Sequence, residues 1–571
     1  MDARCALCDP HIQQKDAALK ILVLGGYGVF GGRLIELLSD LPQIEMIVAG
    51  RNLARAVKYC AAYSGRAKVR PLQLDRNDID RGLVAEQPDL VVDASGPFQE
   101  YGDHGYFVIE ACIKHRVNYL DFADAADFVF GVSHLDRAAQ DAGVFALSGV
   151  SSFPVLTAAV LSEMSQSMDV LSVTGGIAPS PFAGIGLNVM RAVVGYAGAP
   201  VRLIQNGQQT TVPGLTQSMR YTIAVPGKLP LANIRFSLVD VPDLQILPSE
   251  FPQLRDIWMG AGPVPESLHR ILNLLAKARA KLNLPSFAPL APLFYAVLNL
   301  AKFGEHRGGM FVHATGVRNG VPRVRSWHLL AEGDDGPYIP SMAIEAIVRK
   351  LIAQDAPTPG ARPATNTLTL EDYERLFQGR TITTGFREEP SPNAPLYRQV
   401  LGDAFDSLPS QIRALHDDCQ ARSWTGSARV QRGTGAISRA LGWMLGFPPG
   451  AENTPVTVQF DPIEGGETWR RTFGRASFSS TQTRGSGRND HLLLERFGPI
   501  EVALALVVQD NKLYLVPRRW TFCGLPMPKA LLPGGKSFEA QVDGKFHFNV
   551  EISAPLVGLI AAYQGELEPS S

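Results

Sequence analysis

A glycine motif near the N-terminus is the most chemically informative pattern in the chain. Gly26, Gly28 and Gly31 have the spacing G-x-G-x-x-G, after the apolar run 21–24 and before a helical stretch at 33–41. In such a motif the first glycine permits a tight turn, the second lets the backbone approach a pyrophosphate, and the third lets helix and strand pack closely. The motif predicts a dinucleotide site rather than a packing turn without a ligand, with the cofactor contacting the whole loop: Gly26, Tyr27, Gly28, Val29, Phe30 and Gly31.

Arg51 and Asn52 follow the second apolar run, 46–49, where an NAD site carries an Asp or Glu for the ribose 2′-hydroxyl. A carboxylate there would repel a 2′-phosphate. Arg51 instead offers a charged, planar guanidinium that matches phosphate, and Asn52 adds a neutral donor. The sequence therefore predicts NADP(H) in preference to NAD(H). The alternative is that Arg51 is only a solvated surface arginine.

Two further segments are expected at the same edge of the sheet. Asp75 follows the run 71–74 and is predicted to lie against the adenine ring, or else to cap the next helix. The turn Ser95-Gly96-Pro97-Phe98 follows the run 90–94, and its backbone amides are predicted to contact ribose or phosphate. Phe98 is expected either to wall the nicotinamide pocket or to belong to the core.

The candidates for catalysis are Tyr101 and His104 after the fourth run, and Asp124 after the fifth. Hydride transfer needs little from a protein beyond holding a substrate carbon against the nicotinamide and moving one proton. A histidine titrates near neutral pH, which suits that task. The alternatives are a polar loop role for His104 and a helix-capping role for Asp124.

The elements that position these residues form an alternating pattern in residues 1–150. Short apolar runs are separated by helical stretches, and this pattern predicts βαβ units and a doubly wound parallel sheet, the Rossmann fold. The expected strands lie at 21–24, 46–49, 69–74, 90–94, 119–122 and 144–147.

Residues 151–338 are predicted to form a second α/β domain built on one sheet, with helical insertions at 187–197 and 265–303. A helix at 339–354, with Pro340 near its start, is expected to return to the first domain. The proline-rich stretches 355–366 and 387–395 predict a linker region at 355–392. Residues 393–571 are then predicted to form a C-terminal α+β domain, mostly β, that begins with a helix at 396–419.

Composition excludes several classes of function. The 571 residues carry 54 Lys+Arg and 55 Asp+Glu, so no positive field favours nucleic acid. Cys5 and Cys8 form a C-x-x-C without a second pair, and we expect no metal site. Six cysteines and no apolar leader fit a cytoplasmic protein. The apolar segment 284–302 contains three prolines and is too short to span a bilayer, but an amphipathic helix near 271–294 leaves peripheral membrane contact open.

Several of these motifs together resemble the saccharopine-dehydrogenase-like family. The resemblance covers roughly 20–380 and rests on the glycine loop, Ala49-Gly50-Arg51, the Ser95–Phe98 turn, Tyr119-Leu120-Asp121, and the runs 148–154, 239–244 and 336–340. It implies a Rossmann domain followed by an α/β substrate domain, and NAD(P)-linked oxidoreduction. Saccharopine itself is not implied. Many relatives read Asp-Leu-Thr-Gly-Glu after the fifth strand, whereas this chain has Ala125 in place of the glutamate.

Residues 393–571 resemble a bacterial domain of unknown function that is found alone or fused to such dehydrogenase-like regions. The resemblance rests on the segments 469–473, 494–499, 531–533 and 543–548. It implies no chemistry. The arginines of these segments and Glu495 are candidates to line a polar pocket, and His547, on an alternating strand, is a candidate functional residue. The alternative is a cross-strand framework of ion pairs and aromatic side chains.

Two hypotheses about function follow. The first is an NADP-dependent oxidoreductase acting on a small or lipid-like substrate between the first two domains, with enoyl or imine reduction as examples. The second is a non-catalytic dinucleotide-binding module that senses redox state or scaffolds the C-terminal domain. A homodimer is compatible with either.

Overall fold

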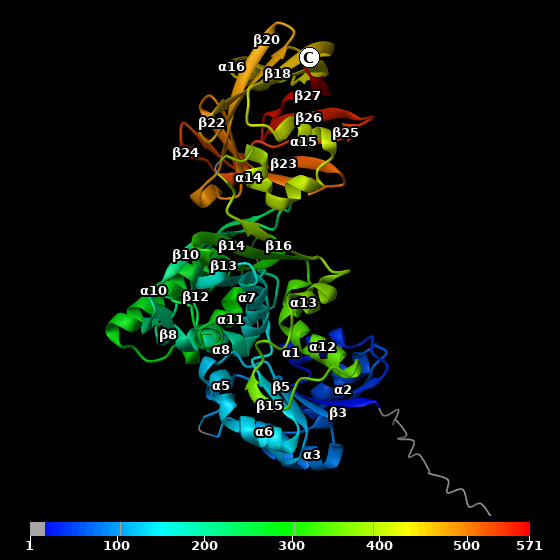
Figure 1. Ribbon diagram of the computed structural model, residues 1–571, viewed down its shortest axis with the longest axis vertical. Helices are drawn as coiled ribbons and strands as arrows, with labels where there is room; N and C mark the ends of the chain where they lie inside the picture. Colours follow the sequence, from blue (N-terminus) through cyan, green and yellow to red (C-terminus); the bar gives the residue numbers. More distant parts are fainter. Residues whose placement is uncertain are drawn as a thin grey trace, which may run out of the picture.

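The computed structural model describes residues 18–570 except 103, 185, 264, 301–303 and 392. Three sheets follow one another along the long axis of the molecule, with the N-terminal sheet at one end and the C-terminal strands at the other (Figure 1). Cys5 and Cys8 lie outside the described residues. The predicted fold class, a Rossmann domain, a second α/β domain and a mostly β C-terminal domain, is confirmed.

The first sheet has seven parallel strands in the order β3-β2-β1-β4-β5-β6-β15. The strand order reverses between β1 and β4, and in such sheets ligands bind in the crevice beyond the carboxyl ends at this point. The strands are β1 Leu19–Leu24, β2 Ile44–Gly50, β3 Lys68–Gln73, β4 Leu90–Asp93, β5 Asn118–Asp121, β6 Phe145–Ser148 and β15 Gly360–Pro363.

Helices cover both faces of this sheet, because its central strands are apolar on both sides. They are α1 Val29–Leu37, α2 Leu53–Ala62, α3 Ile79–Glu86, α4 Phe107–Lys114, α5 Ala126–Gly131 and α6 Asp136–Ala142, with the short turns η1 Arg76–Asp78, η2 Phe98–Glu100 and η3 Val132–Leu135. The predicted return helix is α12, Ile339–Ile352, and it packs on α1. Arg349 of α12 donates to Asp40 beyond the end of α1 at 2.9 Å.

The second sheet has seven strands in the order β10-β11-β12-β7-β13-β14-β16. They are β7 Asp169–Ala178, β10 Ser218–Ile223, β11 Leu231–Leu238, β12 Asp256–Ala261, β13 Arg307–Arg318, β14 Val321–Glu332 and β16 Ile382–Glu388, with the hairpin β8 Pro200–Gln205 and β9 Gln208–Pro213 apart. The accompanying helices are η4 Ser152–Leu156, α7 Thr157–Ser165, α8 Leu187–Tyr196, α9 Asp243–Glu250, α10 Glu266–Leu282, η5 Ala288–Leu290, α11 Ala291–Leu300, η6 Gly336–Tyr338 and α13 Leu370–Phe377.

The predicted linker at 355–392 was wrong, because this segment completes both sheets. Its strand β15 pairs with β6 at the edge of the first sheet, and β16 pairs with β14 at the edge of the second. Proline is tolerated at sheet edges, where a strand lacks a partner on one side. The prolines of this segment therefore mark edge strands and turns, and not a flexible connection.

Two predicted helices are interrupted. The helix expected at 396–419 is split into α14 Leu396–Leu401, η7 Gly402–Ser407 and α15 Ser410–His416, because Gly402 has a positive φ of 60° and Pro409 precedes the next helix. The insertion at 265–303 is split into α10 and α11 around the prolines at 285 and 289. Within the described residues, no helix has the length and apolar character needed to cross a bilayer.

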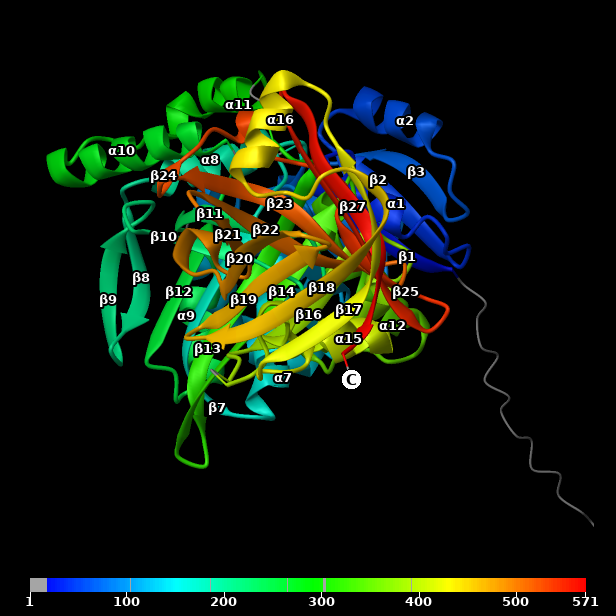
Figure 2. The same cartoon turned by 90° about the horizontal axis from the view of Figure 1, so that it is seen from above.

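The C-terminal strands form one antiparallel sheet that closes on itself. Its order is β22-β21-β20-β19-β18-β17-β27-β26-β25-β23-β24, and the additional pairing of β22 with β23 joins the two ends into a barrel, which faces the viewer in Figure 2. The strands are β17 Arg422–Arg432, β18 Ala451–Ile463, β19 Gly466–Phe473, β20 Ala476–Arg484, β21 Leu493–Phe497, β22 Ile500–Gln509, β23 Lys512–Phe522, β24 Leu525–Pro526, β25 Phe538–Val542, β26 Lys545–Ala554 and β27 Gly558–Pro569; α16 Ala436–Met444 and the turns η8 Gly487–Asn489 and η9 Lys529–Leu531 complete the domain.

Candidate functional site

The glycine loop joins β1 to α1, and its backbone packs so closely that side chains would not fit at two of its positions. Gly25 has a positive φ of 73°, and a Cβ on it would lie 2.7 Å from the carbonyl oxygen of Ala94. A Cβ on Gly31 would lie 2.6 Å from the carbonyl oxygen of Gly25. The motif predicted the tight turn at Gly26, but the residue with the left-handed conformation is Gly25. Gly28 directly precedes α1 and donates to the Gly25 carbonyl at 2.8 Å.

The first residues of α1 present backbone amides and are anchored by their side chains. Phe30 stacks on Phe122 at a centroid distance of 5.6 Å, and its carbonyl accepts from Ser341 of α12 at 3.3 Å. The side chain of Val29 is exposed. The unpaired amides at the start of a helix attract anions, so α1 points its positive end at the space above the loop.

Tyr27 connects the glycine loop to the end of β2. Its ring covers Gly50, where a Cβ would lie 2.5 Å from the ring, and its hydroxyl accepts from the Asn52 amide at 3.1 Å. Asn52 caps α2 by accepting from the Arg55 amide at 3.0 Å. Arg51 is exposed at this edge, and its side chain has no partner within the described residues.

Arg55 is a second cation at this place, and the sequence analysis missed it. Its guanidinium lies 4.9 Å from the centroid of the Tyr27 ring. The signal that would have found it is its place in the first turn of α2, directly after the Asn52 cap.

Asp75 has the capping role that was the alternative to an adenine contact. Asp75 precedes η1 and accepts from the Asn77 amide at 3.0 Å, which is a capping role. This capping does not remove Asp75 from the edge of the sheet at which β3 ends.

The turn after β4 is held by a buried hydrogen-bond network. Asp93 is fully buried and accepts from the Ser95 amide at 2.9 Å and from the Ser95 hydroxyl at 2.5 Å. Ser95 in turn bonds the Tyr101 hydroxyl at 2.9 Å, and the Arg76 guanidinium lies 3.3 Å from the centre of the Tyr101 ring. Burial, followed by the negative charge of Asp93, raises the pKa of Tyr101 above its usual value. Tyr101 therefore acts on this turn as a positioning group.

Phe98 belongs to the core, one of the two roles left open. It is buried and packs on Tyr101 and Phe128 at centroid distances of 4.8 and 5.2 Å. Pro97 follows a cis peptide bond, and the Gly96 carbonyl accepts from the side-chain amide of Asn188 in α8 at 2.8 Å. The turn thus contacts the second domain directly.

The other two catalytic candidates, His104 and Asp124, differ in exposure. His104 is exposed on the turn before α4, and its ring has no partner within the described residues. Asp124 is partly buried and accepts from Gln99 of η2 at 3.0 Å. Burial raises the pKa of Asp124, and the Gln99 hydrogen bond opposes this rise.

Two residues of the second domain, Tyr196 and Asp240, lie near enough to Asp124 for its charge to act on them, and they were not among the candidates from the sequence. Burial first, and then the charges of Asp240 and Asp124, raises the pKa of Tyr196 at the end of α8. Burial raises the pKa of Asp240 to about 6, with a further rise from Asp127 and Asp124 and an opposing effect of Arg202. The signal for Asp240 was its place in the run 239–244, which is part of the family resemblance.

An apolar cavity of about 230 Å³ lies between the start of α1 and the second sheet. Its walls include Val29, Phe30 and Ser152 from the first part of the chain, and Val189, Met310 and Leu329 from the second. Arg33 of α1 closes one side by donating to the Ala183 carbonyl at 2.8 Å. The cavity is contiguous with the loop that a dinucleotide would contact.

The residues present fit NADP(H). Gly25 and Gly31 leave a cradle that any side chain would fill, the start of α1 supplies amides, and Arg51 and Arg55 supply positive charge at the end of β2. Within the described part of the chain, no group of three or more His, Cys, Asp or Glu side chains could hold a metal ion.

Two family models match the chain. Residues 21–147 match the saccharopine dehydrogenase NADP binding domain, and residues 408–567 match a domain of unknown function, DUF4166. Both resemblances found in the sequence are therefore confirmed. The N-terminal domain is the NADP-binding domain of an NAD(P)-dependent oxidoreductase, and its cofactor is NADP.

Among solved structures the likeness is distant. An amine dehydrogenase from Mycobacterium smegmatis is 11% identical with a TM-score of 0.32, covering 61% of this chain and 94% of that one. An engineered D-amino acid dehydrogenase bound to NADP+ is 14% identical with a TM-score of 0.31, covering 62% and 94%. The C. glutamicum DAP dehydrogenase is 13% identical with a TM-score of 0.31, covering 61% and 93%. These values assign no substrate. No curated protein sequence matches the chain.

Proposed function

We propose that the chain is an NADP-dependent reductase or dehydrogenase whose substrate is a small or lipid-like molecule bound between the Rossmann domain and the second sheet. The observation that carries this proposal is the apolar cavity of about 230 Å³ that borders Val29 and Phe30 at the start of α1. Ligand pockets in such sheets lie beyond the carboxyl ends of the strands, at the reversal of strand order.

The chain's own residues divide the work of binding. Arg51 and Arg55 hold the 2′-phosphate, because a guanidinium pairs with phosphate through charge-assisted hydrogen bonds. The glycine loop and the start of α1 hold the pyrophosphate. When bound, NADP(H) supplies or accepts the hydride. Asn188 and Arg33 hold the second domain against the cofactor site through their bonds to Gly96 and Ala183.

Asp240, with Asp124 beside it, is proposed to move the proton. A carboxyl whose pKa is raised to about 6 exchanges a proton readily near neutral pH, because general acids work best when their pKa lies near the working pH. Tyr196 stays protonated, since burial and the two carboxylates raise its pKa. Its hydroxyl can therefore donate a hydrogen bond to substrate.

The class of substrate is inferred from the apolar walls of the cavity and from the carboxylates of Asp124 and Asp240. The apolar walls favour an apolar body, as in an enoyl compound. Asp124 and Asp240 lie outside the walls of this cavity. A substrate that extends from it to these carboxylates would carry a group that becomes cationic, as an imine does on protonation. Each of these features supports one of the two reactions considered for this site, enoyl or imine reduction.

The test is oxidation of NADPH followed at 340 nm with matched pairs of cyclic imines and enones of equal size. We expect turnover with one class and at least tenfold lower kcat/KM with Asp240→Asn, while Asp169→Asn, a change of an exposed carboxylate at the start of β7, leaves the rate unchanged. Tight NADPH binding with no turnover of any compound would instead support the sensor or scaffold hypothesis.

A further inference from the structure

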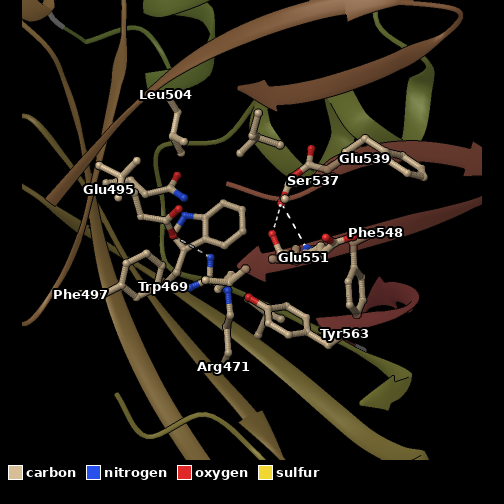
Figure 3. A pocket seen from close by; sticks show the side chains of 18 of the residues that line it. Trp469, Arg471, Glu495, Phe497, Leu504, Ser537, Glu539, Phe548, Glu551 and Tyr563 are labelled. Carbon is tan, nitrogen blue, oxygen red and sulfur yellow. Dashed lines mark hydrogen bonds and ion pairs between the residues drawn. The ribbon is translucent and has the colours of Figure 1, made fainter. Parts of the chain in front are cut away.

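The C-terminal barrel encloses a cavity of about 170 Å³ that is separate from the cofactor site. Its walls are largely aromatic and aliphatic, with side chains from strands on all sides of the barrel. Figure 3 shows several of them around one space: Trp469, Phe497, Leu504, Phe548 and Tyr563. Helices α14 and α15 lie against the barrel on the side that faces the second sheet in Figure 1. A cavity of this size and composition is large enough for a ring or a short chain, since an apolar cavity of about 150 Å³ binds benzene.

A buried ion pair lies in the wall of this cavity. Arg471 of β19 donates to Glu495 of β21 at 3.1 Å and to the Ser480 hydroxyl at 2.7 Å, and both charged side chains are about 10% exposed. Burial works against the charge of Arg471, but Glu495 holds the pKa of the guanidinium above its usual value. The pair therefore adds two opposite charges, but no net charge, to the wall of the cavity.

Two polar atoms of this group have no protein partner. The hydrogen bonds of Glu495 all go to Oε1, from Arg471 and from Ser480, so Oε2 is unused within the described residues. The hydroxyl of Tyr563 is also unused within the described residues, although Tyr563 is only 4% exposed and lines the cavity. Neither atom is among the fully buried polar atoms of the described residues that lack a partner, and both residues line the cavity, so the cavity offers one acceptor and one donor to a molecule within it.

We propose that the barrel binds a small, neutral and mostly apolar molecule that carries one hydroxyl or carbonyl group. The apolar body fills the space among the aromatic side chains, and its oxygen bonds the Tyr563 hydroxyl. A ligand hydroxyl additionally donates to Oε2 of Glu495. For Arg471 and Glu495 the two alternatives drawn from the sequence are compatible, because this ion pair forms the polar end of the cavity.

A ligand with a carboxylate is disfavoured. The positive charge of Arg471 is already balanced by Glu495 at 3.1 Å, and a second carboxylate beside Glu495 would be repelled in a site where little water screens the charges. The polar end therefore selects a neutral head over an anionic head of the same shape.

The test uses the full-length protein and three probes of equal chain length: 1-octanol, octanoate and n-octane. Isothermal titration calorimetry is expected to give saturable binding of one 1-octanol per chain, with octanoate and n-octane each at least tenfold weaker. Tyr563→Phe keeps the volume and removes the hydroxyl, and it should weaken 1-octanol about three- to tenfold, as the loss of one neutral hydrogen bond does. Tyr514→Phe in β23, whose ring packs on Phe538 and does not line the cavity, is the matched control and should bind 1-octanol as the natural chain does.

A second variant separates charge from shape. Glu495→Gln keeps acceptors for Arg471 and Ser480 but leaves one positive charge in the wall, so octanoate should then bind at least as tightly as 1-octanol. The proposal is overturned if no probe binds saturably, if octanoate matches 1-octanol in the natural chain, or if Tyr563→Phe leaves 1-octanol binding unchanged.

Discussion

The side-chain amide of Asn188 in α8 donates a 2.8 Å hydrogen bond to the carbonyl oxygen of Gly96 in the turn after β4. This bond joins the second domain to the edge of the Rossmann sheet at which the nicotinamide half of a dinucleotide binds. A second bond, from Arg33 of α1 to the Ala183 carbonyl, joins the same two parts beside the glycine loop. The two bonds hold the second domain against the Rossmann domain on either side of the proposed cofactor site.

Asn188→Ala should therefore affect catalysis more than stability. Loss of one bond costs about 0.5–1.5 kcal/mol, but a misplaced turn lowers the fraction of bound substrate that is correctly oriented. We expect kcat/KM to fall about tenfold and the melting temperature to change by less than about 3 °C. Asn299→Ala is the control, since Asn299 donates to the Tyr295 carbonyl within α11 only. Equal kcat/KM in the natural chain and Asn188→Ala would show that the bond does not position the turn.

Cofactor preference is predicted to depend on Arg51. A charge-assisted hydrogen bond contributes about 1.5–3 kcal/mol, so Arg51→Ala should weaken NADPH binding about 10- to 100-fold and leave NADH binding nearly unchanged. Arg51→Asp should invert the preference, because a carboxylate repels the 2′-phosphate and accepts from a free 2′-hydroxyl. Fluorescence titrations of both cofactors measure this. Arg55→Ala belongs in the same series, and an NADPH affinity that depends on Arg55 alone would transfer the role to that residue.

The proposed proton donor predicts the pH dependence of NADPH-driven reduction. Burial and the neighbouring Asp127 and Asp124 raise the pKa of Asp240 to about 6, and Arg202 opposes them. Reduction requires the protonated acid, so kcat/KM should be constant below pH 6 and fall about tenfold for each pH unit above it. Asp240→Asn should remove this dependence along with most of the rate. A pH profile that is the same in both proteins would assign the proton to another group.

Stability should depend on the protonation of Asp243, at the start of α9. This carboxyl is fully buried, and burial raises its pKa to about 7, against the opposing effect of the Thr157 hydroxyl. Because the pKa in the folded state is above that of the unfolded chain, the folded state binds more protons between about pH 4 and 7, and stability falls as the pH rises through this interval. The cost at pH 8 is about 2–4 kcal/mol. Urea denaturation at pH 5 and pH 8 should show this difference in the natural chain and a much smaller one in Asp243→Asn.

The Rossmann part was predictable from sequence because its signals are local. The strand ending at Leu24, the glycines and the helix after them lie within about twenty residues, and each fixes the conformation of its neighbours. The place of Arg51 just past the second strand followed from the same spacing.

Contacts between distant segments were not predictable in the same way. Tyr101 is a candidate acid by its position, but its bond to Ser95 depends on the buried Asp93, and nothing in the sequence shows which polar groups are paired. Asp240 reaches Asp124 only through the packing of the second domain on the first. The closure of the barrel depends on the pairing of β22 with β23, and the strands β15 and β16 were hidden by prolines that are tolerated at sheet edges.

The last prediction concerns the junction before the barrel: residues 1–390 and 393–571 should fold as separate units. The buried apolar residues of the barrel form a cluster of their own, distinct from the cluster shared by the first two sheets. The contacts across the junction include the Arg518–Glu305 ion pair at 2.6 Å, the bond from the Val508 amide to the Gly227 carbonyl at 2.9 Å, and a small apolar cluster in which Leu229 packs against the barrel. Interfaces of this kind resemble those between separable domains.

Separate expression should therefore give two cooperative thermal transitions, with the N-terminal unit less stable than it is in the full chain. Arg387 is the reason for that loss, because its guanidinium donates both to the Ala224 carbonyl at 2.6 Å and to the Val400 carbonyl at 3.0 Å, and the cut removes the second acceptor. A fragment 1–380 is the matched control: it lacks β16, exposes the edge of β14 and should aggregate. Loss of cooperative unfolding in both 1–390 and 393–571 would show that the two units are one folding body.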